Sequence, residues 1–231
     1  MEGSRMSRNT IILGDTHAPY EHPKYLDHCL RTRDKYQCEA VIHIGDMVDN
    51  LNASAYPKDA DADSATQEFK AAYNKVQLWQ EKFGKAILIT GNHDVRVLRA
   101  ANRSNLLPQF LRSYSDVWGL KSWKTLDQIT LRYGTQEVLF THGEGLGGGH
   151  SAMNNAIQKH MTCVVFGHLH STAGVVYRQT LGRLLWAMAV GSGISRESVA
   201  MRYAVNNKLP QITSCGVLTS SGVPTVIPLL T

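Results

Sequence analysis

Long apolar runs are missing from this 231-residue sequence, and cysteine is scarce. No uninterrupted apolar stretch approaches the roughly 18 residues that a membrane-spanning helix needs, so we expect no transmembrane span and no membrane partner. The first nine residues carry Arg5 and Arg8 but no apolar segment, which argues against a secretory signal. The four cysteines are far apart and Cys163 lies in an apolar run, so we expect reduced thiols and a cytoplasmic location.

A strong excess of one charge is also absent. The formal net charge is +5 and the basic residues are spread along the chain, which favours a solvated surface over a dedicated polyanion track. The modest excess still suits phosphate-bearing substrates, because a cleft of one sign attracts ligands of the other. The length suffices for one domain with a full core, and we predict a single domain over residues 1–231.

Metal-binding residue types are plentiful, and they follow five short apolar runs. The runs have the length of buried strands and cover residues 10–13, 40–44, 86–90, 137–140 and 163–166. The polar segments that follow them are Gly14-Asp15-Thr16-His17, Gly45-Asp46-Met47-Val48-Asp49-Asn50, Gly91-Asn92-His93-Asp94, Thr141-His142-Gly143 and Gly167-His168-Leu169-His170. Any one of these segments is as easily an ordinary turn at a strand end. Five of them predict one site for two metal ions, because loops at the carboxyl ends of strands converge in α/β sheets.

The remaining pattern predicts helices around these strands. We expect helices over residues 23–35, 64–83, about 94–103 and 151–160, and the apolar stripe of the second should be core packing. Further strands are expected at 128–133, 175–177, 184–190, 215–219 and 223–227, with antiparallel pairing. The polar stretch 51–63 should form a surface loop over the site. The fold class is therefore α/β, with two packed sheets flanked by helices.

The candidate ligands favour a particular chemistry. Carboxylate oxygens, imidazole nitrogens and one amide oxygen suit first-row divalent ions, and no cysteine is among the candidates. Two cations need a shared anion between them, and Asp46 is our choice for this bridge. Such a pair lowers the pKa of bound water from about 15.7 toward 7 and neutralises charge on a phosphoryl group. A positioned histidine contributes roughly 10²–10⁴-fold as the general acid that protonates the leaving oxygen.

The five segments, in this order, resemble the signature of calcineurin-like metallophosphoesterases: D-x-H, G-D-x-x-D, G-N-H-[DE], a separate His and G-H-x-H. This resemblance covers residues 14–170 and implies an αββα two-sheet sandwich with a dinuclear metal site at the carboxyl ends of the strands. Position by position, it implies that the first metal is held by Asp15, His17 and His170, with Asp46 as the bridge. The ligands of the second metal would be Asn92, His142 and His168. The general acid would be His93, oriented by Asp49, whereas Asp94 would either join the site or brace the following helix.

Departures from the family pattern narrow the prediction. Protein serine/threonine phosphatases and diadenosine-tetraphosphate hydrolases carry an arginine after the second aspartate, where this chain has Asn50, so both are disfavoured. No second domain is recognisable, which weakens a match to full-length DNA-repair nucleases. Segments 54–59, 141–144 and 203–216 are similar to small phosphoesterases of phage and prophage genomes. We keep Asn50 as a candidate substrate contact.

Three arginines follow the third motif on one helix face. Arg96, Arg99 and Arg103 share this face, and two interpretations stay open: a binding site for a second phosphate or nucleic-acid backbone, or an ordinary solvated surface. Of these, Arg96 and Arg99 are candidate substrate residues. The glycines between positions 143 and 149 permit either a lid or a plain flexible connector.

The sequence thus predicts a metal-dependent phosphoesterase, with phosphodiesters favoured over monoesters. A hydroxide bridging the two metals would be the nucleophile and His93 the acid. Manganese is the favoured metal, and iron, zinc, magnesium and nickel also suit the ligands. The alternatives are a DNA or RNA nuclease, whose affinity should fall steeply with salt, and a non-catalytic metal-binding scaffold. The sequence identifies neither the physiological substrate nor the oligomeric state.

Overall fold

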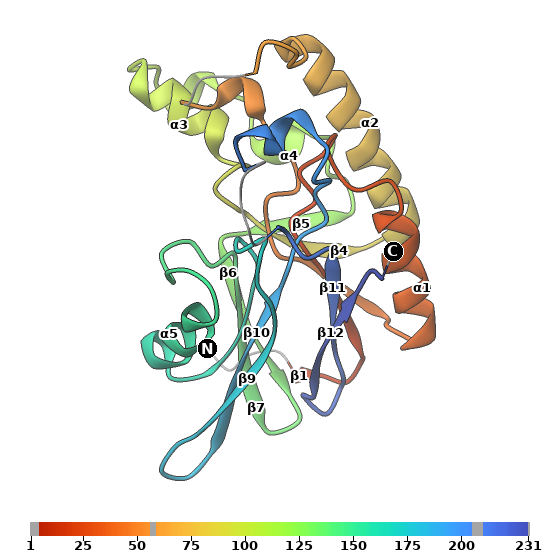
Figure 1. Ribbon diagram of the computed structural model, residues 1–231, viewed down its shortest axis with the longest axis vertical. Helices are drawn as coiled ribbons and strands as arrows, with labels where there is room; N and C mark the ends of the chain where they lie inside the picture. The colour runs from red at the N-terminus through yellow and green to blue at the C-terminus, as the bar shows by residue number, and fades with distance from the viewer. Residues whose placement is uncertain (1–4, 56–58, 205–209, 231) are drawn as a thin grey trace.

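Two sheets pack face to face in the computed structural model, which describes residues 5–55, 59–204 and 210–230 (Figure 1). The first sheet has the strand order β12-β11-β2-β3-β4-β5 and the second β1-β6-β7-β8-β10-β9. In the first sheet the strands are β2 (Thr10–Leu13), β3 (Ala40–His43), β4 (Ala86–Ile89), β5 (Trp123–Leu126), β11 (Ser214–Leu218) and β12 (Pro224–Pro228). In the second they are β1 (Arg5–Met6), β6 (Gln128–Tyr133), β7 (Gln136–Thr141), β8 (Cys163–Phe166), β9 (Ala173–Gln179) and β10 (Leu184–Val190).

The parallel strands point their carboxyl ends to the same side of the molecule. β2, β3, β4 and β5 run parallel to one another in the first sheet, and β7, β8 and β10 do so in the second. The expected antiparallel pairs are confirmed for β6 with β7, β9 with β10 and β11 with β12. β11 also pairs antiparallel with β2, so the end of the chain completes the sheet that its beginning starts.

Helices cover the outer face of each sheet. α1 (Tyr25–Lys35) and α2 (Ala65–Phe83) lie on the first sheet, and α5 (Ser151–His160) lies on the second, giving the predicted αββα layers (Figure 1). Alternate residues of β2 explain this arrangement: Ile12 packs between the sheets, whereas Ile11 and Leu13 pack under α1 and α2. α3 (Arg96–Arg103), α4 (Tyr114–Val117) and the 3₁₀ helices η1 (Leu51–Ala53), η2 (Pro108–Phe110) and η3 (Val199–Ala204) connect these layers.

α2 shows how local sequence sets an element. Ser64 accepts a hydrogen bond from the Gln67 amide and the Gln67 side chain reaches back, which forms a capping box, and Gly84 ends the helix at φ 64°. The prediction that the whole apolar stripe of α2 is core is wrong at Phe69. This ring is 41% exposed and contacts Tyr73 and Trp118, because it lies about one turn before Ala72, the first residue of α2 in the buried cluster.

Within the described ranges, no helix combines the length and apolar character needed to cross a membrane. All four cysteines are buried and form no disulfide. The predicted loop over the site contains η1, and its positions 56–58 lie outside the described residues.

Candidate metal centre

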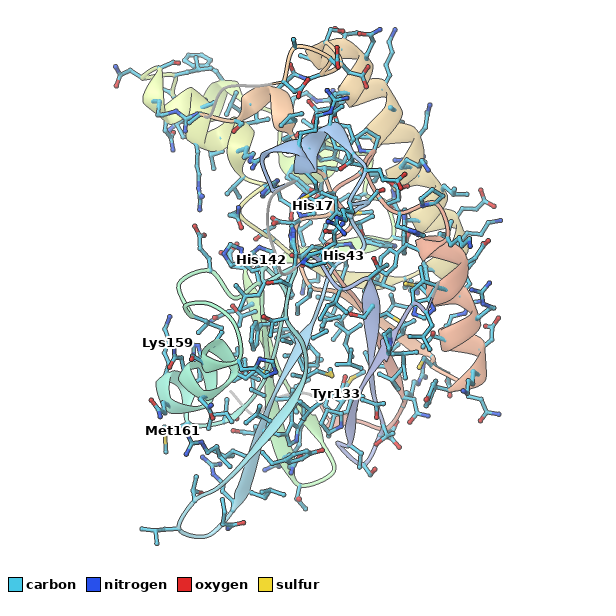
Figure 2. All side chains as sticks on the ribbon, viewed as in Figure 1. His17, His43, Tyr133, His142, Lys159 and Met161 are labelled. Carbon is cyan, nitrogen blue, oxygen red and sulfur yellow. The ribbon has the colours of Figure 1, made fainter. Side chains whose placement is uncertain are left out.

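All five polar segments meet where β2, β3, β4, β7 and β8 end. Figure 2 shows His17 and His142, from the first and fourth segments, close together at this end of the two sheets. Three groups of side chains there have ligand atoms within 4.8 Å of one another. They are Asp15, His17, Asp46 and His170; Asp46, His142 and His168; and His17, Asp49 and His93. The convergence that the motif positions predict is therefore present in the structure.

The first group lies between the two sheets. His17 Nε2 is 3.0 Å from His170 Nε2 and 3.8 Å from Asp46 Oδ2, and His170 Nε2 is 3.3 Å from Asp15 Oδ2. The other ring nitrogen of His17, Nδ1, donates to Asp49 Oδ1 at 2.7 Å, because a carboxylate can only accept. This hydrogen bond leaves Nε2 of His17 facing the group, as second-shell carboxylates do for metal-binding histidines.

The second group uses the same kind of orientation. His142 Nδ1 donates to the Ile44 carbonyl at 3.0 Å, so its Nε2 points at Asp46 Oδ2 (3.2 Å) and Asn92 Oδ1 (3.0 Å). The ring of His168 stands edge-on to that of His142, with centroids 5.1 Å apart. Asp46 belongs to both this group and the first. It therefore occupies the position that a carboxylate bridge between two cations requires.

The carboxylates fit cations better than they fit any protein partner. Asp15 is fully buried and its Oδ1 has no hydrogen-bond partner, an unfavourable state that a bound cation would relieve. Burial alone would raise the pKa of Asp46, but His142 and the neighbouring histidines outweigh it and hold that pKa well below its ordinary value. Burial lowers the pKa of His142, yet Asp46 and Asp15 raise it to about 10. This strongly negative environment suits two divalent ions.

Two glycines allow the carboxylates to sit where they do. A Cβ at Gly91 would overlap the carboxylate of Asp46, and a Cβ at Gly167 would overlap that of Asp15. Each glycine directly precedes a predicted ligand, and a backbone amide just after each glycine donates to the aspartate concerned. The amide of His93 donates to Asp46 Oδ1 and that of His168 to Asp15 Oδ2, both at 2.7 Å. The absence of a side chain at Gly91 and Gly167 therefore lets the backbone approach both carboxylates closely.

Several predicted ligands have a strained backbone. His17, Asp46 and His168 have φ values of 52°, 50° and 66°, in the left-handed region that residues other than glycine rarely enter. Such conformations cost on the order of 1–3 kcal/mol each and concentrate at functional sites. Here they turn imidazole and carboxylate groups inward from consecutive loops.

Asp49 has a second partner besides His93. Asp49 Oδ1 accepts from His93 Nδ1 at 3.0 Å as well as from His17 Nδ1. Burial would raise the pKa of Asp49, but hydrogen bonds from His17 and His93 dominate and lower it. For His93, burial lowers the pKa, and Asp46 and Asp49 together raise it. Asp49 thus connects a predicted metal ligand to the predicted acid, a link that the sequence motif did not reveal.

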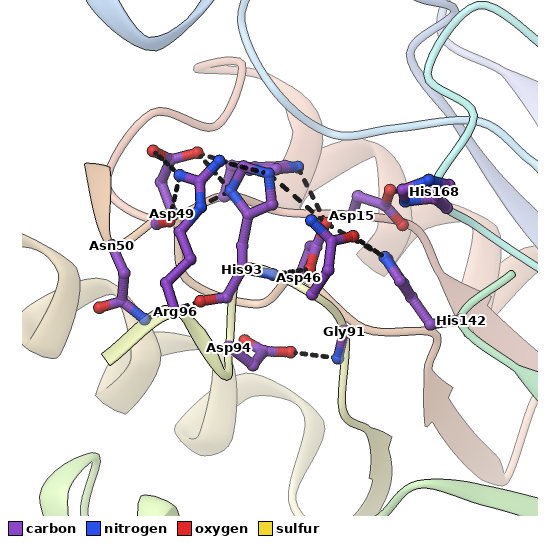
Figure 3. Close-up of polar contacts among 12 residues, drawn as sticks. Asp15, Asp46, Asp49, Asn50, Gly91, His93, Asp94, Arg96, His142 and His168 are labelled. Carbon is purple, nitrogen blue, oxygen red and sulfur yellow. Dashed lines mark hydrogen bonds and ion pairs between the residues drawn. The ribbon is translucent and has the colours of Figure 1, made fainter. Parts of the chain in front are cut away.

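Asp94 braces the site from behind. It is 4% exposed and accepts hydrogen bonds from the amides of Met47, Val48 and Gly91 and from the Tyr114 hydroxyl. Figure 3 shows the contact with Gly91, on the side away from the other acidic groups. Burial, together with the charge of Asp46, raises the pKa of Asp94 to about 6. Asp94 therefore braces the loop of the second motif, and not the following helix, whose N-cap receives no side-chain hydrogen bond.

The candidate substrate residues are placed differently from one another. Arg96 lies across Asp49 and His93: its Nη1 donates to the Asp49 carbonyl at 2.9 Å, and its Nη2 is 2.9 Å from His93 Nε2 (Figure 3). Asn50 donates to the His93 carbonyl at 3.0 Å, so its amide supports the loop. Arg99 pairs with Glu144 at 3.0 Å, and Arg103 is 3.5 Å from the Ala53 carbonyl. Only the first of the three arginines points into the metal centre.

The architecture and site together define a class: a two-sheet sandwich with a buried cluster of carboxylates and imidazoles that could hold metal ions. The calcineurin-like phosphoesterase superfamily domain matches residues 9–204. The chain therefore belongs to this superfamily.

Individual relatives are distant. The chain is 24% identical over 211 residues to the Gene 54 protein of Mycobacterium phage D29, which covers 81% of this chain and 80% of that protein. Among solved structures it is similar to YfcE, a phosphoesterase from E. coli, with 15% identity, a TM-score of 0.49 and coverage of 91% and 87% of the two chains. It is also similar to Vacuolar Protein Sorting 29 of Cryptosporidium parvum, with 12% identity, a TM-score of 0.48 and coverage of 96% of each chain.

The cleft in front of the centre contains residues that no motif predicted. Leu51, Ile194, Ala200 and Met201 line it together with His17, His93 and His170. Leu51 directly follows the second motif, which is a weak signal. The other three lie between positions 194 and 201, outside all five motifs, so only the folded chain brings them to the site.

Proposed function

We propose that the protein is a metal-dependent phosphoesterase that hydrolyses phosphodiesters in preference to monoesters. The observation that carries the proposal is that two groups of potential metal ligands share the buried carboxylate of Asp46. Two divalent ions bound there would supply hydroxide at neutral pH and neutralise charge on a phosphoryl group. Manganese is the proposed metal, because mixed oxygen and imidazole ligands accept it readily.

His93 is the proposed general acid. Asp49 accepts the hydrogen bond of Nδ1, which fixes the ring so that Nε2 faces the cleft. A proton held on Nε2 would pass to the leaving oxygen of the ester. His93 Nε2 lies 4.0 Å from Asp46 Oδ2, so the acid stands beside the metal groups without belonging to the two groups that share Asp46.

Arg96 is the proposed phosphate contact. Its Nη2 donates to His93 Nε2 at 2.9 Å, because a guanidinium can only donate. A phosphoryl oxygen of the substrate would accept this hydrogen bond in place of Nε2, which would then be free to carry the proton for the leaving oxygen. α3 would then supply the guanidinium that related phosphatases carry after the second aspartate, where this chain has Asn50.

The contacts of Arg99 and Arg103 argue against the nuclease alternative. Arg99 is engaged with Glu144 and Arg103 lies near the Ala53 carbonyl, so the row of three does not present a free track for a nucleic-acid backbone. A nuclease that neutralises several phosphates would lose affinity steeply with added salt. We expect a shallow salt dependence.

The test is metal-dependent hydrolysis of bis-p-nitrophenyl phosphate and p-nitrophenyl phosphate. Protein stripped of metal should be inactive, and manganese should restore cleavage, faster for the diester. The Asp46→Asn variant should lose this activity. Cleavage that persists without metal or in the variant would contradict the proposal, and metal binding without turnover of either ester would favour the scaffold alternative.

A further inference from the structure

The cleft in front of the metal centre is lined by residues of two kinds. Its volume is about 530 Å³, within the range of roughly 300–1,000 Å³ typical of small-ligand sites. The polar lining consists of His17, Asp49, Ser54, His93, Arg96 and His170. Four apolar residues, Leu51, Ile194, Ala200 and Met201, line the same cleft, and we call them the apolar wall. A phosphate bound at the polar residues would therefore have its ester groups in a cleft that also offers apolar contacts.

The apolar wall is held in place by buried contacts. Ile194, Ala200 and Met201 are 1%, 6% and 7% exposed and form a small cluster with Tyr20. The Ile194 amide donates to Ser192 Oγ at 3.1 Å, which fixes the start of this segment. The wall therefore exists before any ligand binds.

Leu51 is fixed by a different element. Its amide donates to Glu68 Oε1 at 2.6 Å, and the amide of Asn52 donates to Oε2 at 2.9 Å. Glu68 belongs to α2 and is 4% exposed, so this carboxylate binds η1 to the helix. Both edges of the apolar wall are thus anchored to the layers of the fold.

Charge in the cleft is limited. Among the described residues that line it, Arg96 is the only lysine or arginine. One guanidinium beside the metal groups suits one phosphoryl group, and a chain of phosphates would find no further cationic partner along the apolar wall. The enclosed volume also differs from the open surface that a duplex requires.

We propose that the apolar wall receives the face of a flat organic group of nucleobase type, carried by a small phosphodiester whose phosphate lies at the metal groups and Arg96. This inference rests on the proposed phosphodiesterase function and specifies its substrate class. A ring packed against Leu51, Ile194 and Met201 would lose its contact with water, which stabilises the complex. Substrates with a small or polar ester group would lack this contribution.

The experiment compares two diesters with one leaving group. Thymidine 5′-(p-nitrophenyl phosphate) and methyl p-nitrophenyl phosphate both release p-nitrophenolate, so the difference lies in the group retained on phosphorus. With manganese-loaded protein, we expect kcat/KM to be higher for the thymidine ester by roughly tenfold or more. Both esters also carry the flat p-nitrophenyl ring, so inhibition by compounds without that ring is the direct test of binding at the apolar wall. We expect thymidine 5′-monophosphate to inhibit more strongly than methyl phosphate.

Variants of the apolar wall sharpen the test. Met201→Ser and, separately, Leu51→Ser should lower kcat/KM for the thymidine ester more than for the methyl ester, so the ratio between the two falls. Leu181→Ser, in the exposed turn between β9 and β10, is the matched control and should change neither value. If the Met201→Ser variant does not fold, the Leu51→Ser variant and the comparison of the two esters with the wild-type protein still test the proposal.

The outcomes separate the two proposals. Equal kcat/KM values for both esters, with equal inhibition by both monophosphates, would overturn the apolar wall as a substrate site and leave the phosphodiesterase function standing. A ratio that Met201→Ser and Leu51→Ser leave unchanged would overturn it as well. If the protein hydrolyses none of these esters, including bis-p-nitrophenyl phosphate, the proposed function is overturned and this inference with it.

Discussion

The two ends of the sheets solve the same problem of chain reversal with different residues. At the far end, the turns after β6 and β9 place Gly134 and Gly182 at φ 57° and 124°, conformations that glycine adopts without a steric penalty. At the metal end, His17, Asp46 and His168 adopt positive φ values beside the glycines Gly45 and Gly143. At the far end, Gln37 and Met161, before β3 and β8, are also at φ 50°, but neither is a candidate ligand. What separates the two ends is therefore that, at the metal end, predicted ligands themselves occupy this conformation.

Burial differs in the same direction. Asp15, Asp46 and Asp49 are 0%, 1% and 2% exposed at the metal end, whereas Leu181 at the tip of the β9–β10 turn is fully exposed. Buried carboxylates with unsatisfied oxygens destabilise a fold unless a cation compensates them. Substitutions at the two ends should therefore differ in the size of their effect. Those at the metal end should abolish function, and those at the far end should have little effect.

The largest effect is expected for Asp49→Ala. This change removes the hydrogen-bond partner of both His17 and His93, so kcat should fall by roughly 10²–10⁴-fold and metal affinity by about 10–100-fold. His93→Ala is the matched variant and should lose a comparable part of kcat while retaining its metal. Steady-state kinetics with metal titration measures both values. Unchanged metal affinity in Asp49→Ala would contradict the link between the two histidines.

A somewhat smaller effect is expected for Gly91→Ala. The added methyl group would overlap the Asp46 carboxylate and push the bridge away, so metal affinity should fall by about 10–100-fold. Gly148→Ala is the control, because an added Cβ there meets nothing within 4 Å. Calorimetric titration with manganese compares the two variants. Equal affinities would show that the close approach at Gly91 is dispensable.

Arg96→Ala should have a moderate effect on a diester substrate. Loss of the guanidinium beside His93 should reduce kcat/KM by roughly tenfold, since a charge-assisted hydrogen bond to phosphate contributes about 1.5–3 kcal/mol. Arg99→Ala should stay within about twofold, because this side chain pairs with Glu144 in an exposed contact. The reverse order of effects would move the phosphate contact along α3 and revive the arginine row as a nucleic-acid site.

The smallest effect belongs to Leu181→Ser at the far end. This exposed residue contributes little to the fold, so the free energy of unfolding should change by less than about 0.5 kcal/mol. Denaturant unfolding and diester hydrolysis should both match the wild type. A loss of activity in this variant would show that the two ends are coupled, and would contradict the expectation that the far end has little effect on function.

The sequence predicted the centre well because its signals are local. Each candidate ligand lies within a few residues of a strand end, and the structure brings the side chains of Asp15, His17, Asp46, His142 and His168 into the two overlapping groups. Their roles as ligands stay predictions. The boundaries of α5 and of β2, β6, β8 and β10 were also predicted as the structure has them, because apolar periodicity and flanking turns define them.

Features that depend on distant partners were missed. β1 consists of Arg5–Met6 and exists through pairing with β6, more than 120 residues away in sequence. The pairing of Asp49 with His17 and the apolar wall from Leu51 to Met201 likewise join segments that share no local pattern. The side-chain contact of Asn50 with His93 depends on a left-handed turn at φ 51° that the sequence did not specify.

The central claim is that the metal end holds two cations around Asp46. Protein stripped of metal, reloaded with manganese and freed of excess ion should be measured for bound manganese by elemental analysis. The wild type and Leu181→Ser should each hold two ions per chain, as the two groups that share Asp46 imply, and Asp46→Asn should hold fewer. At most one ion in the wild type, or an undiminished two in Asp46→Asn, would contradict the account.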